Sequence, residues 1–157
     1  MNNELCKKIS KARYELSKDV SSVIFGEIND GVVCDENLRI KPYCDFLNVC
    51  NGASCGDIDL WSNEDIGQNQ FRVTDLDGGS EKWVCIGQIL YEPLVINLDS
   101  EEVYLFYQGH EKEIEGKCFG KFDDFLMEYV FGEKYAEIIP DVQGDEWYSF
   151  LRRINFV

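Results

Sequence analysis

The chain has 157 residues, a length that suits one domain, and 45% of them are hydrophobic, which is ample material for a buried core. Thirty acidic residues against fifteen basic ones give a formal net charge of −15. That charge argues against binding to a nucleic-acid backbone or to an anionic membrane surface. It is compatible with a basic protein partner, although solubility alone is the simpler explanation.

The N-terminal stretch and the cysteines indicate the compartment. Residues 1–16 are charged and amphipathic and lack the apolar segment of a secretory signal, and no apolar run approaches the length of about 18 residues that a transmembrane helix needs. The cysteines are odd in number and scattered in spacing: Cys6, Cys34, Cys44, Cys50, Cys55, Cys85 and Cys118. We therefore expect a cytoplasmic protein whose cysteines are free thiols in a reducing compartment.

Two helices are predicted in the first third of the chain. Apolar residues recur at helical spacing over residues 3–18, on the face formed by Leu5, Ile9, Ala12 and Leu16. A shorter helix is predicted from Pro42, which suits a first helical turn, to a left-handed stop at Asn51-Gly52. Its apolar stripe consists of Tyr43, Phe46, Leu47 and Cys50.

The middle of the chain predicts an antiparallel sheet. Alternating residues over 57–62 and 70–76 predict two strands, and the apolar run 82–90 predicts a central strand covered on both faces. Residues 91–109 predict a hairpin that turns at 99–102. Its two strands place on one face Leu94, Ile96 and Leu98, then Val103, Leu105 and Tyr107.

The last third predicts helices again. One apolar stripe consists of Phe122, Phe125, Leu126, Tyr129 and Val130, and a second consists of Trp147, Phe150, Leu151 and Ile154. Pro140 ends the first of these helical regions. The order of helices, sheet and helices predicts a single α+β domain over residues 1–157, with N-terminal and C-terminal helices packed on a central antiparallel sheet.

Candidate catalytic residues do not form a recognisable motif. His110 is the single histidine, and the position four residues later is Ile114, so the paired histidines of a metalloprotease are absent from the sequence. No nucleophile elbow or phosphate-binding glycine loop occurs. Asp123 and Asp124 suit the first turn of a helix, where the macrodipole favours acids. We therefore expect a protein that is not an enzyme and has no cofactor.

Metal sites are disfavoured on similar grounds. Cys44, Cys50 and Cys55 lack the paired spacing of a zinc site, and we expect them to be buried thiols. The acidic turn at residues 75–81 resembles a calcium loop, but Val73 stands where the first ligand would be. We therefore expect no bound metal.

Several short motifs occur in a characteristic order. In chain order they are Pro42, Asn51-Gly52, Trp61, Ile86-Gly87, Tyr91-Glu92-Pro93, Val103-Tyr104 and the Phe-x-x-Phe-Leu stretch at 122–126. Over residues 38–131 this order resembles the SUKH superfamily, which contains a yeast cell-wall regulator and many bacterial immunity proteins. The resemblance implies a SUKH-like α+β domain.

The same resemblance implies a non-catalytic binding function. Immunity proteins of this superfamily bind and neutralise bacterial toxins, many of which are nucleases with basic surfaces that an acidic inhibitor would complement. The alternative is a regulatory scaffold or a peptide-binding module without a toxin partner. A scaffold of this kind usually carries disordered segments, whereas this chain ends in a compact apolar helix.

The toxin contact is expected on acidic positions around the sheet edge and loops, with Trp61 as an aromatic anchor. These positions are Asp57, Asp59, Trp61, Glu64, Asp65, Asp75, Asp77 and Glu92. At any one acidic position a solvated surface charge is the simpler explanation, and Trp61 suits a core or partly buried position better than an exposed anchor. The sequence leaves open which strand forms the edge of the sheet and whether the chain forms oligomers.

Overall fold

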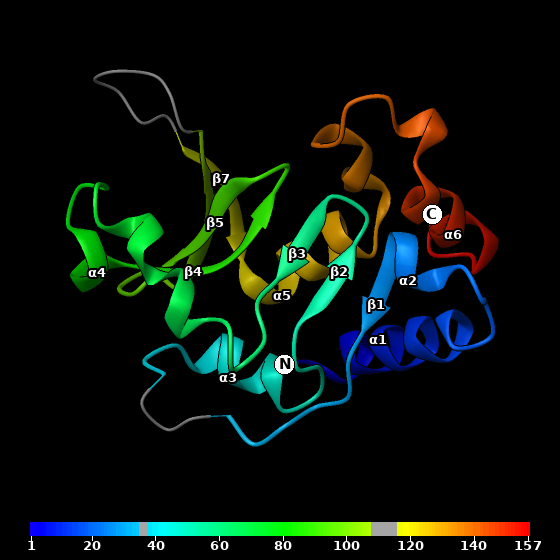
Figure 1. The fold of residues 1–157 in the computed structure, drawn as a ribbon, viewed down its shortest axis with the longest axis horizontal. Coiled ribbons are helices and arrows are strands. Elements are labelled where there is room, and N and C mark those ends of the chain that lie inside the picture. Colours follow the sequence, from blue (N-terminus) through cyan, green and yellow to red (C-terminus); the bar gives the residue numbers. More distant parts are fainter. Residues whose placement is uncertain (35–37, 108–115) are drawn as a thin grey trace.

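A computed structural model describes residues 1–34, 38–107 and 116–157 (Figure 1). Seven strands form one antiparallel sheet in the order β1-β2-β3-β4-β5-β6-β7, so each strand pairs with its neighbours along the chain. N-terminal and C-terminal helices contact this sheet, which confirms the predicted single α+β domain. His110 lies outside the described residues.

The elements are short. The strands are β1 (Gly26–Ile28), β2 (Ala53–Cys55), β3 (Ile58–Leu60), β4 (Trp83–Ile89), β5 (Glu92–Asn97), β6 (Glu102–Phe106) and β7 (Gly116–Lys121). The α-helices are α1 (Asn3–Leu16), α2 (Ser22–Phe25), α3 (Lys41–Leu47), α4 (Gly79–Lys82), α5 (Phe122–Phe125) and α6 (Glu146–Arg153). The 3₁₀ turns are η1 (Gly67–Val73), η3 (Glu133–Glu137) and η4 (Val142–Gly144), and a π-helical turn, η2 (Leu126–Val130), continues α5. Among the described residues, none of these helices has the length and apolarity that crossing a bilayer requires.

The helices begin where the sequence supplies a cap and bury the predicted stripes. The Asn2 side chain accepts a hydrogen bond from the Leu5 N–H at the start of α1, and Asp145 accepts one from the Tyr148 N–H at the start of α6. All four residues of the predicted α1 stripe are buried, and so are the two stripes predicted in the last third. These helical predictions are therefore confirmed.

The central strand is also confirmed, because β4 is the fourth strand of the seven and is covered on both faces. One face carries the main core, which includes residues of α1, α3, α5 and α6. The other face carries a smaller apolar cluster, formed by Val73, Trp83, Cys85, Val95 and Phe106. Residues 61–82, between β3 and β4, supply the cover for this second cluster.

The strand predicted at residues 70–76 is wrong, because residues 70–73 belong to the 3₁₀ turn η1 and residues 74–76 form turns and a bend after it. Its Gln70 side chain reaches the bulged part of β4, where Nε2 donates to the Cys85 carbonyl at 2.9 Å and Oε1 accepts from the Cys85 N–H at 3.0 Å. The segment therefore lies across the sheet, and Val73 is buried while Phe71 is 70% exposed. Alternation along the sequence cannot distinguish this arrangement from a strand.

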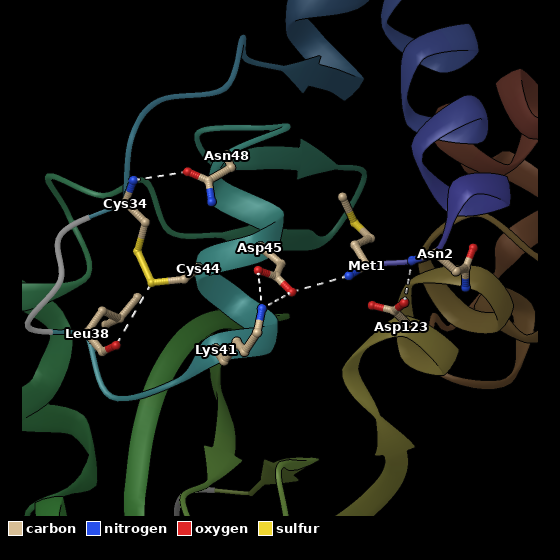
Figure 2. Close-up of polar contacts among 9 residues, drawn as sticks. All are labelled: Met1, Asn2, Cys34, Leu38, Lys41, Cys44, Asp45, Asn48 and Asp123. Atoms are coloured by element: carbon tan, nitrogen blue, oxygen red, sulfur yellow. Dashed lines mark hydrogen bonds and ion pairs between the residues drawn. A yellow bond between two sulfur atoms is a disulfide. The ribbon is translucent and has the colours of Figure 1, made fainter.

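The prediction that all cysteines are free thiols is wrong for one pair. Cys34 and Cys44 form a disulfide between the segment after β1 and α3, whereas the other five cysteines are free (Figure 2). This disulfide forms because the segment after β1 returns to α3, and the spacing of the cysteines in the sequence does not predict that return. Cys50 and Cys55 are buried thiols, as predicted, and burial raises the pKa of Cys50 to about 12.

Polar contacts join α3 to the neighbouring helices. The Lys41 ammonium lies 2.8 Å from the Asp45 carboxylate, which also accepts from the Met1 ammonium at 3.3 Å (Figure 2). The Asn2 N–H donates to Asp123 in the first turn of α5 at 2.9 Å. These contacts bring the starts of α1, α3 and α5 to one side of the main core.

Strands β1 and β7 form the two edges of the described sheet. The β1 edge is partly occupied, because the Arg13 guanidinium donates from Nε to the Ile28 carbonyl at 3.2 Å and from Nη2 to the Asn29 carbonyl at 2.7 Å. The Gly26 N–H donates a hydrogen bond to the Ser22 carbonyl of α2. Such blocking of an edge strand disfavours pairing with another chain.

Candidate functional site

The sheet face opposite the main core changes character along the sheet. Over β4, β5 and β6 it is apolar and covered by residues 61–82, as described above. Over β1, β2 and β3 it is polar, because the alternation of each strand points one polar residue away from the core. In the view of Figure 1, β2 and β3 lie in front of α5. We call this second part the open polar face.

The open polar face is built on a row of four residues in adjacent strands. Cross-strand register pairs Glu27 with Ser54, Ser54 with Asp59, and Asp59 with Gln88. Residues paired in this way have neighbouring Cβ atoms on one face of the sheet. Glu27 is exposed, whereas the other three are half-buried.

Hydrogen bonds fix the centre of this row. The Asp59 carboxylate accepts from the Ser54 hydroxyl and from Gln88 Nε2, each at 2.8 Å. Arg72 of η1 then donates from Nη1 to Gln88 Oε1 at 2.9 Å and from Nη2 to the Tyr91 carbonyl. The guanidinium is thus engaged by neutral acceptors, so it ties η1 to the sheet without forming an ion pair in these contacts.

Two aromatic side chains border the open polar face. Phe71 precedes Arg72 in η1 and is 70% exposed, and Tyr91, whose carbonyl Arg72 binds, is 84% exposed. Large aromatic side chains that remain exposed beside a polar surface are typical of protein-binding sites. The face therefore combines a fixed polar centre with apolar side chains at its border.

Carboxylates gather at the turn between β2 and β3. The Asp57 N–H donates to the Tyr135 hydroxyl at 3.4 Å, and that hydroxyl donates to Asp145 at 3.0 Å. Partial burial raises the pKa of Asp57, and the carboxylates of Asp145 and Asp59 raise it further. Burial beside Asp145 also raises the pKa of Tyr135, which remains a neutral donor. Negative charges are thus held close together here at some cost to folding.

This cost predicts a measurable pH dependence. The folded-state pKa of Asp57 is above its unfolded value of about 3.9, so ionisation of Asp57 destabilises the fold at any pH above the folded pKa. This penalty decreases as the pH falls from the folded pKa to the unfolded pKa. Asp57→Asn should therefore raise the free energy of unfolding at pH 7 and change it little below the unfolded pKa. Urea unfolding at a series of pH values measures the difference.

Asp45→Asn is the matched control with the opposite sign. The hydrogen bond from Lys41 lowers the pKa of Asp45, so its stabilisation is present above an unfolded pKa of about 3.9 and is lost as the pH falls through the folded pKa. Asp45→Asn should lower stability at pH 7. If both substitutions change stability in the same direction at pH 7, the assignment of strain to the Asp57 cluster is wrong.

The eight residues predicted to contact a partner fall into separate groups. Asp57, Asp59 and Glu92 lie toward one end of the sheet, since Leu90 donates its N–H to the Asp57 carbonyl at 3.1 Å and Ile89 pairs with Glu92. Asp57 is exposed, and the other two are half-buried.

The remaining predicted acids lie elsewhere. Asp77 is near the start of β4, because its carbonyl accepts from Trp83 Nε1 at 2.8 Å, and Asp75 lies beside it in sequence. The two ends of β4 are about 20 Å apart at the usual rise of a strand. Glu64 and Asp65 follow β3 at its other end, where Glu64 accepts from Asn51 at 3.0 Å and Asp65 accepts from Ser62 at 2.6 Å.

The structure places Trp61 between the two apolar clusters rather than on the surface. It is half-buried and packs against residues of both clusters, and its backbone N–H donates to the Ile86 carbonyl at 2.8 Å. This position suits a residue that joins the cover of residues 61–82 to the core. Phe71 and Tyr91 are the more exposed aromatic candidates for an anchor.

Several residues of the open polar face are missing from the sequence-based prediction. They are Glu27, Ser54, Arg72, Gln88 and Asp145. Alternation in β3 identifies Asp59 as an outward residue, but its neighbours depend on pairing between strands that are only three residues long. Arg72 lies in the segment for which the sequence predicts a strand.

The arrangement is suited to recognition. Hydrogen bonds from Ser54 and Gln88 hold the Asp59 carboxylate in place. Among the described residues, no three His, Cys, Asp or Glu side chains lie together in a way that could hold a metal ion. Fixed charges of this kind favour an approaching group of opposite charge. No known protein-family model matches the chain, and no curated protein matches it significantly in sequence.

Proposed function

We propose that the chain is a non-catalytic protein-binding module, and specifically an immunity protein that binds and neutralises a bacterial toxin. The resemblance of its ordered motifs to the SUKH superfamily supports this proposal. The observation that carries it is the open polar face, where one part of the sheet presents acidic side chains while the adjacent part is covered by its own chain. The exposed aromatic residues Phe71 of η1 and Tyr91 of the turn between β4 and β5 lie next to residues of this face.

The charge of this face supports a basic partner. Four carboxylates lie on or beside it, namely Glu27, Asp57, Asp59 and Asp145. Glu92 pairs with the core residue Ile89 and therefore belongs to the opposite face of the sheet. Arg72 is a cation in the same place, and it donates hydrogen bonds to the neutral oxygens of the Gln88 side chain and the Tyr91 carbonyl. With a net charge of −15, the chain attracts a basic surface from a distance, and opposite fields raise association rates about 10- to 1,000-fold.

A basic toxin such as a nuclease is the partner that this charge would complement. Nucleases bind the phosphate backbone through clustered lysine and arginine side chains. A fixed acidic face that occupies such a surface would exclude the nucleic acid without any chemical step. Phe71 and Tyr91 would supply apolar contact area, and an aromatic side chain that a partner covers completely contributes most to binding.

We also propose that the chain acts in the cytoplasm, where an inhibitor of an imported nuclease would protect its cell. Five free thiols suit a reducing compartment. The Cys34–Cys44 disulfide does not follow from that location.

A growth experiment tests the proposed function. The C-terminal domain of a large secreted protein encoded beside this gene is expressed in a bacterial cytoplasm, with and without the chain. We expect the domain to stop growth when expressed alone and growth to be restored when the chain is present. If a toxic domain still stops the growth of cells that contain abundant folded chain, the immunity proposal for that pair is rejected and a scaffold role gains support.

A further inference from the structure

The turn between β4 and β5 has a backbone conformation that its residues do not favour. Cross-strand register pairs Ile89 with Glu92, so the loop consists of Leu90 and Tyr91 alone. Both residues have positive φ angles, 50° for Leu90 and 71° for Tyr91. Two successive positive φ angles are required by the type I′ turn, for which Asn-Gly is the preferred sequence. A bulky side chain in this conformation is an outlier, so the turn is strained at two successive positions.

The composition of this turn differs from that of the other strained positions. Among the described residues, the other non-glycine residues with positive φ are Glu101, Asp141 and Asn155. All three are polar, and asparagine and aspartate are the residues that tolerate this conformation best after glycine. Leu90 and Tyr91 are the apolar exceptions, and they follow one another in the chain.

Packing inside the fold does not account for tyrosine at this turn. The Tyr91 side chain is 84% exposed, and Leu90 is also partly exposed at 39%. A glycine in place of Tyr91 would remove the strain at that position and uncover little of the core. Strained residues that the surrounding structure holds in place are typical of functional sites. The exposed ring of Tyr91 is therefore the feature that the strained turn displays.

The turn is held firmly on both sides. Arg72 Nη2 donates to the Tyr91 carbonyl, and the Leu90 N–H donates to the Asp57 carbonyl at 3.1 Å. The chain continues into β5 through the buried Pro93, whose ring fixes its own φ angle. A side chain presented by a fixed backbone loses less freedom on binding than one on a mobile loop.

Negative charge lies directly beside the turn. The contact with Leu90 places Asp57 next to it, and Asp57 is exposed. The carboxylates of Asp145 and Asp59 are close enough to raise the pKa of Asp57. An ammonium or guanidinium group of a partner placed beside Asp57 would relieve this repulsion. An apolar anchor next to such carboxylates fits a basic surface that contains an apolar pocket.

We propose that Tyr91 is the anchor of the interface, and that it inserts, together with Leu90, into an apolar pocket that lysine or arginine side chains border on the toxin. This inference rests on the proposed function, since the basic partner is the toxin, and it assigns the central contact to one turn. Aromatic side chains that a partner covers completely are the residues that contribute most to binding.

Tyr91→Gly separates the effect on binding from the effect on stability. Relief of strain should outweigh the greater freedom that glycine gives the unfolded chain, so we expect the urea midpoint to rise, by about 0.3 M. We also expect the affinity for the C-terminal domain of the large secreted protein encoded beside this gene to fall about 30-fold. Urea unfolding and titration calorimetry on the full chain measure the two effects.

Two further variants are the controls. Tyr91→Phe keeps the apolar ring and should bind nearly as tightly as the unchanged chain. Asn155→Gly replaces another exposed residue with positive φ, in the segment after α6, and should leave the affinity unchanged. An equal loss of affinity in Tyr91→Phe and Tyr91→Gly would show that the ring is not an apolar anchor.

The remaining outcomes separate this inference from the proposed function. If the unchanged chain binds the domain and Tyr91→Gly binds it equally well, the anchor is wrong while toxin binding stands. If Tyr91→Gly unfolds at a lower urea concentration than the unchanged chain, Tyr91 has a structural role and the strain argument is overturned. If the unchanged chain does not bind a domain proven toxic, the proposed function fails and the anchor fails with it.

Discussion

Replacing Glu27 and Asp57 together by lysine is expected to slow association with the proposed basic partner about tenfold at low salt, and less at moderate salt. Both side chains are exposed and lie on the open polar face or at its edge, so the change reverses the field where the partner approaches. Asp59 is left intact because its carboxylate holds Ser54 and Gln88. Stopped-flow or surface-based kinetics measures the association rate.

The matched control changes the same number of charges elsewhere. Asp75→Lys with Asp77→Lys alters the net charge equally, but both residues lie near the start of β4, away from the β2–β3 turn. This pair should slow association by the smaller amount that net charge alone explains. If the two double variants behave alike, the open polar face is not the interface, although a general electrostatic attraction would remain.

Replacing Trp147 by alanine is expected to destabilise the fold by about 3–5 kcal/mol, a large share of the stability of an ordinary domain. Trp147 is fully buried, its indole N–H donates to the Val130 carbonyl at 2.9 Å, and its ring lies 5.2 Å from that of Phe150. A Cβ atom at Gly26 would lie only 2.8 Å from this ring, so α6 and β1 are in close contact through it. Urea unfolding measures the loss.

Phe71→Ala is the control for this substitution. It also removes a large aromatic side chain, but one that is 70% exposed, so stability should change by no more than about 0.5 kcal/mol. A loss below about 1 kcal/mol for Trp147→Ala would mean that α6 does not form part of the main core. Because Phe71 borders the proposed interface, its variant should instead weaken partner binding.

Most of the core follows from the sequence because each helix buries one periodic stripe. Helical spacing predicts the buried stripes of α1, from Leu5 to Leu16, and of α6 and the residue after it, from Trp147 to Ile154. The residues at these intervals are the ones that pack in the core. The apolar run of β4 likewise predicts a strand between two layers. In these segments, local pattern and tertiary packing agree.

The sequence pattern does not predict the structure of segments whose conformation is determined by tertiary contacts. Strands β1 and β2 have three residues each, too few for a pattern, and exist because neighbouring strands supply their hydrogen bonds. The segment around Gln70 alternates like a strand but binds the backbone of β4 through its side chain. The open polar face depends on pairing between strands that are far apart in the sequence, and the disulfide depends on the chain before α3 returning to that helix, so neither could be derived from spacing.

Titration calorimetry against the neighbouring toxin domain, at low and at moderate salt, tests the central claim most directly. We expect tight binding that weakens as salt rises, because the proposed interface joins an acidic face to a basic one. Tight binding that does not change with salt would contradict the electrostatic basis and move the interface to apolar residues. No binding at either salt, to a domain proven toxic, would contradict the claim that this chain is its immunity protein.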